Sequence, residues 1–404
     1  MRKLIVFILL AVFQLAEVQA AGLQDSLVIK KTKELVTQVQ KKYAPDKRTA
    51  LFQAQFPAEN VVAIETTDKQ ALQEFNTLLK KEGINLQVRE RLLPDAGLDG
   101  KIYGVARLSV CNNRTTPGNA AEMATQMILG TPVQVLKKER GYYLVRTPDQ
   151  YLSYTDDAGV TLMDEKEFAS WKAAEKVIFT DDYGYSYQQA SVTSMRVSDL
   201  VNGNILQVLG KQNDFYKVAY PDKRTAFIPV KSARPYSAWV SRPVPTAAQI
   251  LETAKTMIGV PYLWGGTSIK GVDCSGFTKT SYFLNGIILP RDASQQALVG
   301  EPVDIFEGDS LNMDKALRNL RPGDLLFFAA GKAKAATKPR VTHTAIYIGD
   351  GTFIQAAGLV RINSMFPDAV NYDDFQTRTI VGARRMLTAV GKPEVTRVDH
   401  HPWY

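Results

Sequence analysis

Residues 261–277 read PYLWGGTSIKGVDCSGF, and they set the architecture that we expect for the C-terminal part of the chain. Proline and glycine at the start of this stretch predict a loop, and the residues after Cys274 predict a helix that ends near Gly286. At such a junction the backbone N–H groups and the helix dipole favour a thiolate, so we expect a lowered thiol pKa and a cysteine suited to acyl transfer. A lone cysteine before a helix is more often structural than catalytic, and the downstream sequence has to distinguish the two.

A turn and a β-hairpin follow. Arg321–Phe328 reads as a turn and a buried strand, and Val341–Gly349 alternates like a strand. Asp350-Gly351 predicts a two-residue hairpin turn before a returning strand. His343 therefore lies on one strand of the hairpin and Gln355 on the other. Ideal register places these two side chains on opposite faces, whereas a bulge or a longer turn places them on the same face, and the sequence leaves both open.

Reactive side chains are scarce in the chain of 404 residues, which has two cysteines and three histidines. Two cysteines exclude a disulfide scaffold and a four-cysteine zinc site, and we expect neither a metal nor another cofactor. Cys111 is predicted to be a small buried core residue, and His400 and His401 lie in a tail that we expect to fray. Cys274 and His343 remain as the candidates for nucleophilic chemistry.

These motifs resemble those of the NlpC/P60 family of cysteine peptidases, which has a papain-like fold. The resemblance implies that Cys274 is the nucleophile and that His343 is its general base, which later returns the proton to the leaving amine. It covers about residues 246–386 and is carried by the blocks DCSGF at 273–277, PGDLLFF at 322–328 and HTAIYIGDGTFIQA at 343–356.

The resemblance implies two further catalytic positions. Gln355 stands where the family commonly has a second histidine, and its amide oxygen can accept the imidazole N–H and hold the tautomer. Tyr262 is similar to the family tyrosine whose hydroxyl, with the backbone N–H of Cys274, stabilises the oxyanion. Packing in the core beside Trp264 is the alternative interpretation for Tyr262.

The middle of the chain repeats a pattern of short strands. The segments PVQVL at 132–136 and GYYLV at 141–145 are followed by the equivalents NILQVL at 204–209 and DFYKV at 214–218. This spacing suits small barrels, and it resembles two bacterial SH3-type (SH3b) modules.

SH3-type modules ahead of such a catalytic domain make the chain similar to the γ-D-glutamyl-L-diamino-acid endopeptidases (dipeptidyl-peptidase VI type) of bacterial cell walls. Asp273, Ser275 and Asp292 look like substrate-binding residues beside the nucleophile. Carboxylates there would bind a free α-amine, and so select a peptide that begins L-Ala-γ-D-Glu and is cut after the D-Glu. Glu122 and Tyr151 of the first module are candidates for the same amine site, with a solvated glutamate and a barrel-core tyrosine as the alternative.

We therefore predict an α+β chain, in which a papain-like NlpC/P60 domain follows two small SH3-like β-barrels and an N-terminal α+β segment. Two prolines in residues 238–245 indicate a linker before the catalytic domain. The predicted boundaries are 1–20 for a signal peptide, 21–101 for the N-terminal segment, 102–175 and 176–240 for the SH3-type modules, 246–388 for the catalytic domain and 389–404 for a C-terminal tail.

Residues 1–20 combine basic residues, a short apolar run and a small residue at Ala20, so we expect export to the periplasm or medium, cleavage after about Ala20 and no membrane anchor. The net charge of +8 is dispersed, and nucleic-acid binding is not expected. The expected partners are peptidoglycan-derived peptides, bound by a monomer. Two alternatives are an endopeptidase that acts on the intact sacculus and a catalytically weak wall-binding protein that uses its SH3b modules. The diamino acid, meso-diaminopimelate or lysine, is left open.

Overall fold

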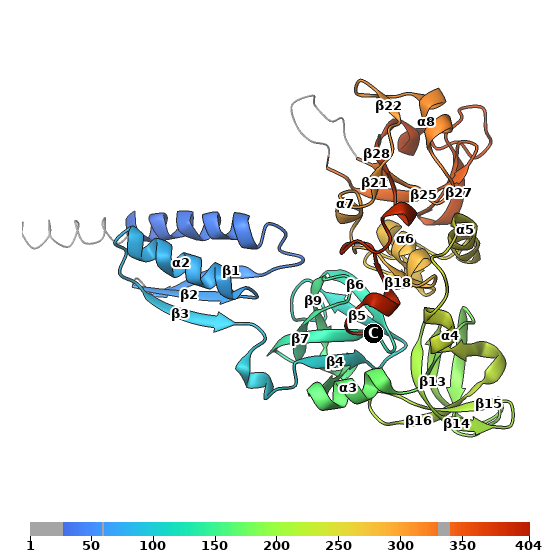
Figure 1. Ribbon diagram of the computed structural model, residues 1–404, viewed down its shortest axis with the longest axis horizontal. Coiled ribbons are helices and arrows are strands. Elements are labelled where there is room, and N and C mark those ends of the chain that lie inside the picture. The colour runs from blue at the N-terminus through green and yellow to red at the C-terminus, as the bar shows by residue number, and fades with distance from the viewer. Residues whose placement is uncertain (1–26, 59, 330–339) are drawn as a thin grey trace, which may run out of the picture. The chain divides into compact units, whose positions relative to one another are not determined.

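The computed structural model describes residues 27–58, 60–329 and 340–404 (Figure 1). The chain folds into two compact units, of which the first ends at Leu98 and the second runs from Asp99 to Tyr404. The predicted signal peptide lies outside the described residues. Among the helices in the described ranges, none is long and apolar enough to cross a membrane.

The first unit is a three-stranded sheet covered by two helices. Strands β1 and β2 are antiparallel, whereas β3 runs parallel to β2. Leu35 and Val39 of the first helix and Phe75 of the second pack on Val62 of the sheet. Asp68 caps the second helix by accepting the backbone N–H groups of Gln70 and Ala71. The elements are a helix over 27–43, β1 (Phe52–Ala58), β2 (Val61–Thr66), α2 (Lys69–Lys81) and β3 (Gln87–Leu92).

The two modules that follow share one topology. The strand order is β10-β4-β7-β8-β9-β5-β6 in the first and β17-β11-β14-β15-β16-β12-β13 in the second, so each strand has its equivalent seven strands later. The strands of the first are β4 (Tyr103–Ala106), β5 (Val110–Arg114), β6 (Met123–Ile128), β7 (Pro132–Glu139), β8 (Tyr142–Arg146), β9 (Leu152–Asp156) and β10 (Val160–Met163), followed by the helix α3 (Glu165–Ala173). Those of the second are β11 (Lys176–Phe179), β12 (Tyr183–Tyr187), β13 (Arg196–Val201), β14 (Ile205–Gln212), β15 (Phe215–Ala219), β16 (Thr225–Pro229) and β17 (Ala233–Pro235).

Cys111 is buried in the first module, as predicted for a core residue, and its thiol donates to the carbonyl oxygen of Gly159 at 3.2 Å. Burial raises the pKa of this thiol to about 11. The side chain is therefore a neutral packing residue.

The prediction of a linker from residue 238 is wrong in its first residues. The helix α4 (Tyr236–Val240) occupies them, and Trp239 is only 3% exposed. The indole N–H of Trp239 donates to the carbonyl oxygen of Leu284 at 3.0 Å. Aromatic burial thus holds the second module against the predicted catalytic domain, which a proline-rich sequence pattern does not reveal.

The prediction that the C-terminal tail frays is also wrong. Strand β29 (Thr396–Arg397) pairs with β20 (Ile287–Ile288), and His401 is buried. The Nε2–H group of His401 donates to the carbonyl oxygen of Pro148 at 3.1 Å, and its Nδ1 accepts the backbone N–H of Trp403 at 3.2 Å. The imidazole is therefore neutral, in keeping with the lowering of its pKa by burial.

The predicted catalytic domain is an antiparallel sheet with the helix α6 (Cys274–Phe283) packed on one face. Phe277 of this helix contacts a core that includes Ile346 and Ile354 of the sheet and Ile250 of α5 (Ala247–Thr256). The strand order is β21 (Glu301–Pro302), β28 (Ile380–Arg385), β24 (Leu325–Phe328), β25 (His343–Gly349), β26 (Thr352–Ala357) and β27 (Leu359–Ser364). Short helices α7 (Ala293–Gln296), α8 (Met313–Asn319) and α9 (Asp374–Arg378) connect these elements.

The first turn of α6 lies against the backbone of the preceding loop. A Cβ atom at Gly276 would stand 1.9 Å from the carbonyl oxygen of Gly266. Because this oxygen belongs to the main chain, no side-chain rotation can relieve the overlap. The glycine of the DCSGF block is therefore required for the loop to sit beside Cys274.

We expect Gly276→Ala to lower the free energy of unfolding by about 3 kcal/mol, because the added methyl group overlaps the main chain. Gly382→Ala in β28 is the matched control, since its Cβ would meet no atom within 4 Å, and it should change stability by less than about 1 kcal/mol. Urea denaturation of both variants measures the difference. Equal midpoints for the two variants would contradict the close-approach argument.

Candidate active site

Cys274 is the first residue of α6, and Asp273 is the N-cap of that helix. The Asp273 carboxylate accepts the N–H of Gly276 at 2.6 Å, while its main-chain carbonyl accepts the N–H of Phe277 at 2.8 Å. The predicted loop-to-helix junction is thus confirmed. The thiol is nearly buried, with 7% of the residue exposed.

The hairpin contains the bulge that the sequence left open. Gly349 pairs with Thr352 across the two-residue turn, but Tyr347 pairs with Phe353, which leaves Ile348 without an opposite residue. Continuing this register places Gln355 opposite the residue two positions after His343, so that both side chains face the same side.

His343 and Gln355 are in contact as a result. The imidazole Nε2 lies 2.6 Å from the amide oxygen Oε1 of Gln355. Because an amide oxygen only accepts, Nε2 carries the hydrogen and Nδ1 holds the free lone pair. This tautomer has its basic nitrogen on the ring edge away from Gln355, as a general base requires.

The predicted direction of the Cys274 pKa is wrong. Burial and the neighbouring Asp273 carboxylate raise the pKa of the thiol to about 12. Hydrogen bonds from the backbone of Thr344, the residue after His343, and of Ser275 act in the opposite direction but do not prevail. Burial also lowers the pKa of His343. At rest the thiol and the imidazole are therefore both neutral, and the Thr344 backbone bonds the sulfur from the strand that carries His343.

Tyr262 lies on the loop before α6, where it forms an isolated bridge with Val272. Its pKa is raised mainly by burial and further by its neighbours Cys274 and Asp273, so its hydroxyl stays protonated. The ring packs against the domain core, but Trp264 is 60% exposed and is not part of that core.

A buried arginine that the sequence did not reveal holds this region together. Arg291 is 1% exposed, and its guanidinium bonds Asp273 through Nη2 at 2.6 Å and Nη1 at 3.1 Å. Nη1 also donates to the Ser275 hydroxyl at 2.9 Å, and Nε donates to Thr125 Oγ1 of the first module at 2.8 Å. Asp273 and Ser275, predicted as substrate contacts, are thus engaged in a buried network. Arginine is so rarely buried that composition gives no signal for it.

The first module contributes both residues that the sequence nominated. The Tyr151 hydroxyl donates to Oδ2 of Asp292, the N-cap of α7, at 3.2 Å. The Glu122 carboxylate accepts the indole N–H of Trp264 at 2.9 Å. Glu122 thus contacts the loop that carries Tyr262, and Tyr151 contacts Asp292, the residue after the Arg291 that bonds Asp273.

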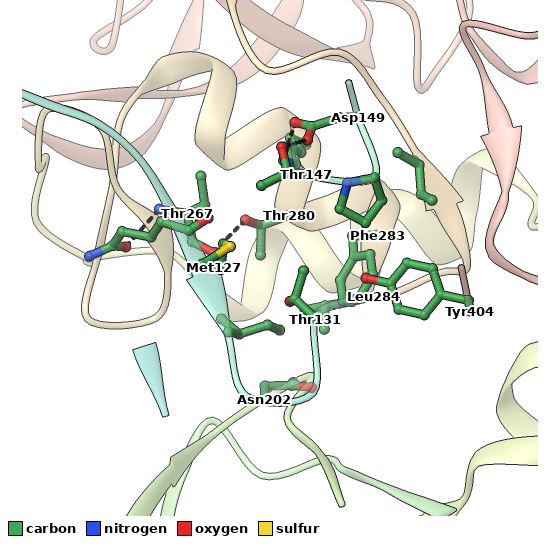
Figure 2. Close-up of a pocket in the computed structure, with 15 residues that line it drawn as sticks. Met127, Thr131, Thr147, Asp149, Asn202, Thr267, Thr280, Phe283, Leu284 and Tyr404 are labelled. Atoms are coloured by element: carbon green, nitrogen blue, oxygen red, sulfur yellow. Dashed lines mark hydrogen bonds and ion pairs between the residues drawn. The ribbon is translucent and has the colours of Figure 1, made fainter. Parts of the chain in front are cut away.

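A separate cavity of about 60 Å³ lies between the first module, α6 and the C-terminus. Figure 2 shows Asp149 and Thr147 at one end and Asn202 at the other, with Tyr404 at the side. Its polar groups already bond one another: the Thr280 hydroxyl donates to the carbonyl oxygen of Thr267, and Lys279 pairs with Asp149. The residues that line it include none of the candidate site residues. Within the described ranges, no group of three histidine, cysteine or acidic side chains is placed to hold a metal ion.

Comparison with known proteins matches this architecture. Residues 259–379 match the NlpC/P60 family, and residues 113–159 match the bacterial dipeptidyl-peptidase Sh3 domain. A γ-D-glutamyl-L-lysine dipeptidyl-peptidase of Bacillus cereus is 30% identical over 275 residues, which span 67% of this chain and 77% of the relative. The chain belongs to the NlpC/P60 family.

Further relatives agree with this membership. A γ-D-glutamyl-L-lysine dipeptidyl-peptidase of Bacillus subtilis is 28% identical over 62% of this chain and 75% of its own length. The crystal structure of an NlpC/P60 family protein from Bacillus cereus superposes with a TM-score of 0.57 at 25% identity, covering 70% of this chain and 99% of that one. An NlpC/P60 endopeptidase from Photobacterium damselae shares the fold at a TM-score of 0.53, over 72% of this chain and 74% of its own, with 16% identity. The predicted fold, an NlpC/P60 domain preceded by SH3-type modules, is confirmed. The family to which the chain belongs is one of peptidases.

Removing Arg291 would leave the Asp273 carboxylate buried without its partner. We therefore expect Arg291→Met to lower the free energy of unfolding by about 3–5 kcal/mol. The matched control is Arg378→Ala, which breaks an ion pair with Asp374 whose two side chains are 63% and 64% exposed, and its effect should stay below about 0.5 kcal/mol. Urea denaturation compares them, and a loss in Arg291→Met no larger than in the control would overturn the role of the pair.

Proposed function

We propose that this NlpC/P60 chain is an exported cysteine peptidase that acts on peptidoglycan peptides with a free N-terminal L-Ala. It would hydrolyse the bond between γ-D-Glu and the diamino acid and release L-Ala-γ-D-Glu. The observation that carries the proposal is the His343–Gln355 bond on the strand beside the Cys274 sulfur, in a chain whose relatives are named γ-D-glutamyl-L-lysine dipeptidyl-peptidases.

The proposed reaction begins with the neutral pair. Nδ1 of His343 takes the proton of the Cys274 thiol as the sulfur attacks the γ-carbonyl carbon of D-Glu. The imidazolium then gives this proton to the leaving amine of the diamino acid, which leaves a thioester on Cys274. Water, deprotonated by the same nitrogen, attacks the thioester carbonyl and expels the Cys274 sulfur. The imidazolium returns its proton to this sulfur, which releases the dipeptide and restores the neutral thiol and imidazole.

The oxyanion would be held by the backbone N–H of Cys274 and the hydroxyl of Tyr262. A raised pKa keeps the tyrosine hydroxyl protonated, so it can donate a hydrogen bond to the developing charge. The N–H groups of Gly276 and Phe277 are taken by Asp273, whereas the N–H of Cys274 precedes them at the open end of the helix.

Recognition of a free amine is supported by the charges around this region. The Arg291 guanidinium pairs with both Asp273, at 2.6 Å, and Asp292, at 3.9 Å, so one cation faces two carboxylates. Asp292 also accepts the Tyr151 hydroxyl, and the Glu122 carboxylate accepts the indole N–H of Trp264. Asp292 and Glu122 thus place two carboxylates where the first module meets the catalytic domain. An N-terminal ammonium group would be attracted there, and Tyr151 would orient Asp292.

Mass analysis of products from L-Ala-γ-D-Glu-L-Lys, with and without N-acetylation, tests the proposal. We expect L-Ala-γ-D-Glu from the free peptide only, and no product with Cys274→Ala. Cys111→Ala is the matched control, because it removes the other cysteine of the chain, and it should retain activity. A meso-diaminopimelate peptide run in parallel decides between the two diamino acids.

Other outcomes would favour the alternatives. Cleavage of the acetylated peptide or of intact sacculi would indicate an endopeptidase without an amine requirement. Binding to sacculi with no hydrolysis of any of these substrates would indicate a wall-binding protein. Equal residual activity in Cys274→Ala would exclude this cysteine as the nucleophile.

The pH dependence follows from the burial of His343. The imidazole must be neutral to accept the thiol proton, and burial lowers its pKa from the ordinary value of 6.5. Activity is thus retained as the pH falls to 6.5, because the imidazole is still neutral there. It is lost only at pH values below 6.5. A profile of kcat/KM against pH measures this acid limb. A limb centred at or above pH 7 would contradict a neutral resting pair.

A further inference from the structure

A second layer of polar residues lies behind the His343–Gln355 bond. The amide nitrogen of Gln355 donates to Asn363 Oδ1 at 2.9 Å and to Asp373 Oδ2 at 3.0 Å. Gln355 is fully buried, and the Asp373 side chain is 12% exposed. Asp373 is also the N-cap of α9, where its other oxygen accepts the N–H of Gln376 at 3.0 Å.

These contacts determine which way the Gln355 amide points. An ionised carboxylate only accepts hydrogen bonds, so the NH₂ group of Gln355 must face Asp373. Asn363 is oriented in the same manner, because Nε of Arg361 donates to its oxygen at 3.1 Å, and its own NH₂ group donates to the carbonyl oxygen of Asn371 at 3.1 Å. Partners that can only accept or only donate a hydrogen bond thus fix the orientation of both amides. As a result, Oε1 of Gln355 faces the imidazole.

The orientation has a consequence for His343. With Oε1 toward the ring, Nε2 carries the hydrogen and Nδ1 keeps its lone pair. An amide rotated by half a turn would present NH₂ to Nε2 and favour the tautomer with hydrogen on Nδ1, which cannot accept a proton from a thiol.

We propose that Asp373 is a positioning residue of the active site: it fixes the Gln355 amide, selects the reactive tautomer of His343 and stabilises the imidazolium that forms during attack. The proposal rests on the proposed function, because it assumes that the His343 imidazole reacts with the Cys274 thiol. Asp373 acts through Gln355 and touches neither reacting group.

The charges that face His343 give the sign of the effect. Asp373 at the start of α9 and Asp273 at the start of α6 favour the imidazolium, whereas Arg361 on β27 opposes it. The thiol of Cys274 on α6 is neutral at rest. Loss of the Asp373 charge should therefore make the imidazolium harder to form.

Two variants and one control test the proposal on the full chain. Asp373→Ala removes the acceptor and the charge, whereas Asp373→Asn retains a side chain that can cap α9 but removes the charge. Asn312→Ala is the matched control, since Asn312 caps α8 in the same domain by accepting the N–H of Lys315 at 2.9 Å. It lies outside the proposed machinery.

Two readouts do not require the natural substrate. The alkylation rate of Cys274 by iodoacetamide as a function of pH reports how readily the thiolate–imidazolium pair forms. ¹⁵N NMR of labelled protein reports the tautomer of His343, and three histidines in the chain keep the signals assignable.

We expect alkylation at pH 7 to slow about tenfold in Asp373→Ala, which corresponds to the loss of one hydrogen bond to a charged group. The same variant should lose the uniform Nε2–H tautomer. Asp373→Asn should give an intermediate rate, and Asn312→Ala the wild-type rate and tautomer. If Asp373→Ala does not fold, the rate in Asp373→Asn decides the question. Wild-type rate and tautomer in both Asp373 variants, or an equal loss in Asn312→Ala, would overturn the proposal.

The design separates the two proposals from each other. If the wild-type chain does not cleave the tripeptides while the Asp373 variants still change the alkylation rate and the tautomer, the substrate assignment fails and the role of Asp373 stands. If the tripeptide is cleaved and the Asp373 variants match the wild type in both readouts, the function stands and the positioning role fails.

Discussion

One carboxylate, that of Asp273, accepts hydrogen bonds from a helix, from the loop before it and from a buried arginine. It binds the N–H of Gly276 in the first turn of α6, the N–H of Gly265 in the preceding loop at 2.9 Å, and two nitrogens of the buried Arg291. Arg291 in turn bonds Thr125 of the first module. The same buried ion pair therefore determines the position of Cys274 and the path of its loop. It also determines the contact between the first module and the catalytic domain.

This arrangement has an electrostatic consequence for the thiol. A carboxylate next to a buried cysteine disfavours the thiolate, so the group that positions Cys274 also raises its pKa. The imidazole of His343 is likewise kept neutral by burial. A site built this way depends on correct orientation of the base, which explains why the Gln355 amide is held by a layer of polar side chains behind it.

The duplicated modules show how one fold serves different purposes. Their strands follow the same order, and an equivalent β-bulge interrupts β7 and β8 in the first and β14 and β15 in the second. Only the first contributes Tyr151 and Glu122 to contacts beside the candidate site. In the second, Asp199 pairs with Lys270 of the catalytic domain. The strand pattern predicted the repeat, whereas the nomination of the first copy came from the family resemblance, because the pattern does not encode packing between modules.

Local sequence was sufficient for the elements that carry the candidate residues. It placed Cys274 at a helix start, His343 and Gln355 on a hairpin and Asp350-Gly351 at its turn, because caps, glycines and alternation act over a few neighbouring residues. Only the tertiary structure decided the bulge at Ile348, the burial of Arg291 and the direction of the thiol pKa. Each of these depends on side chains far apart in the chain, since register, desolvation and charge compensation are set by what packs around a residue and not by its neighbours in sequence.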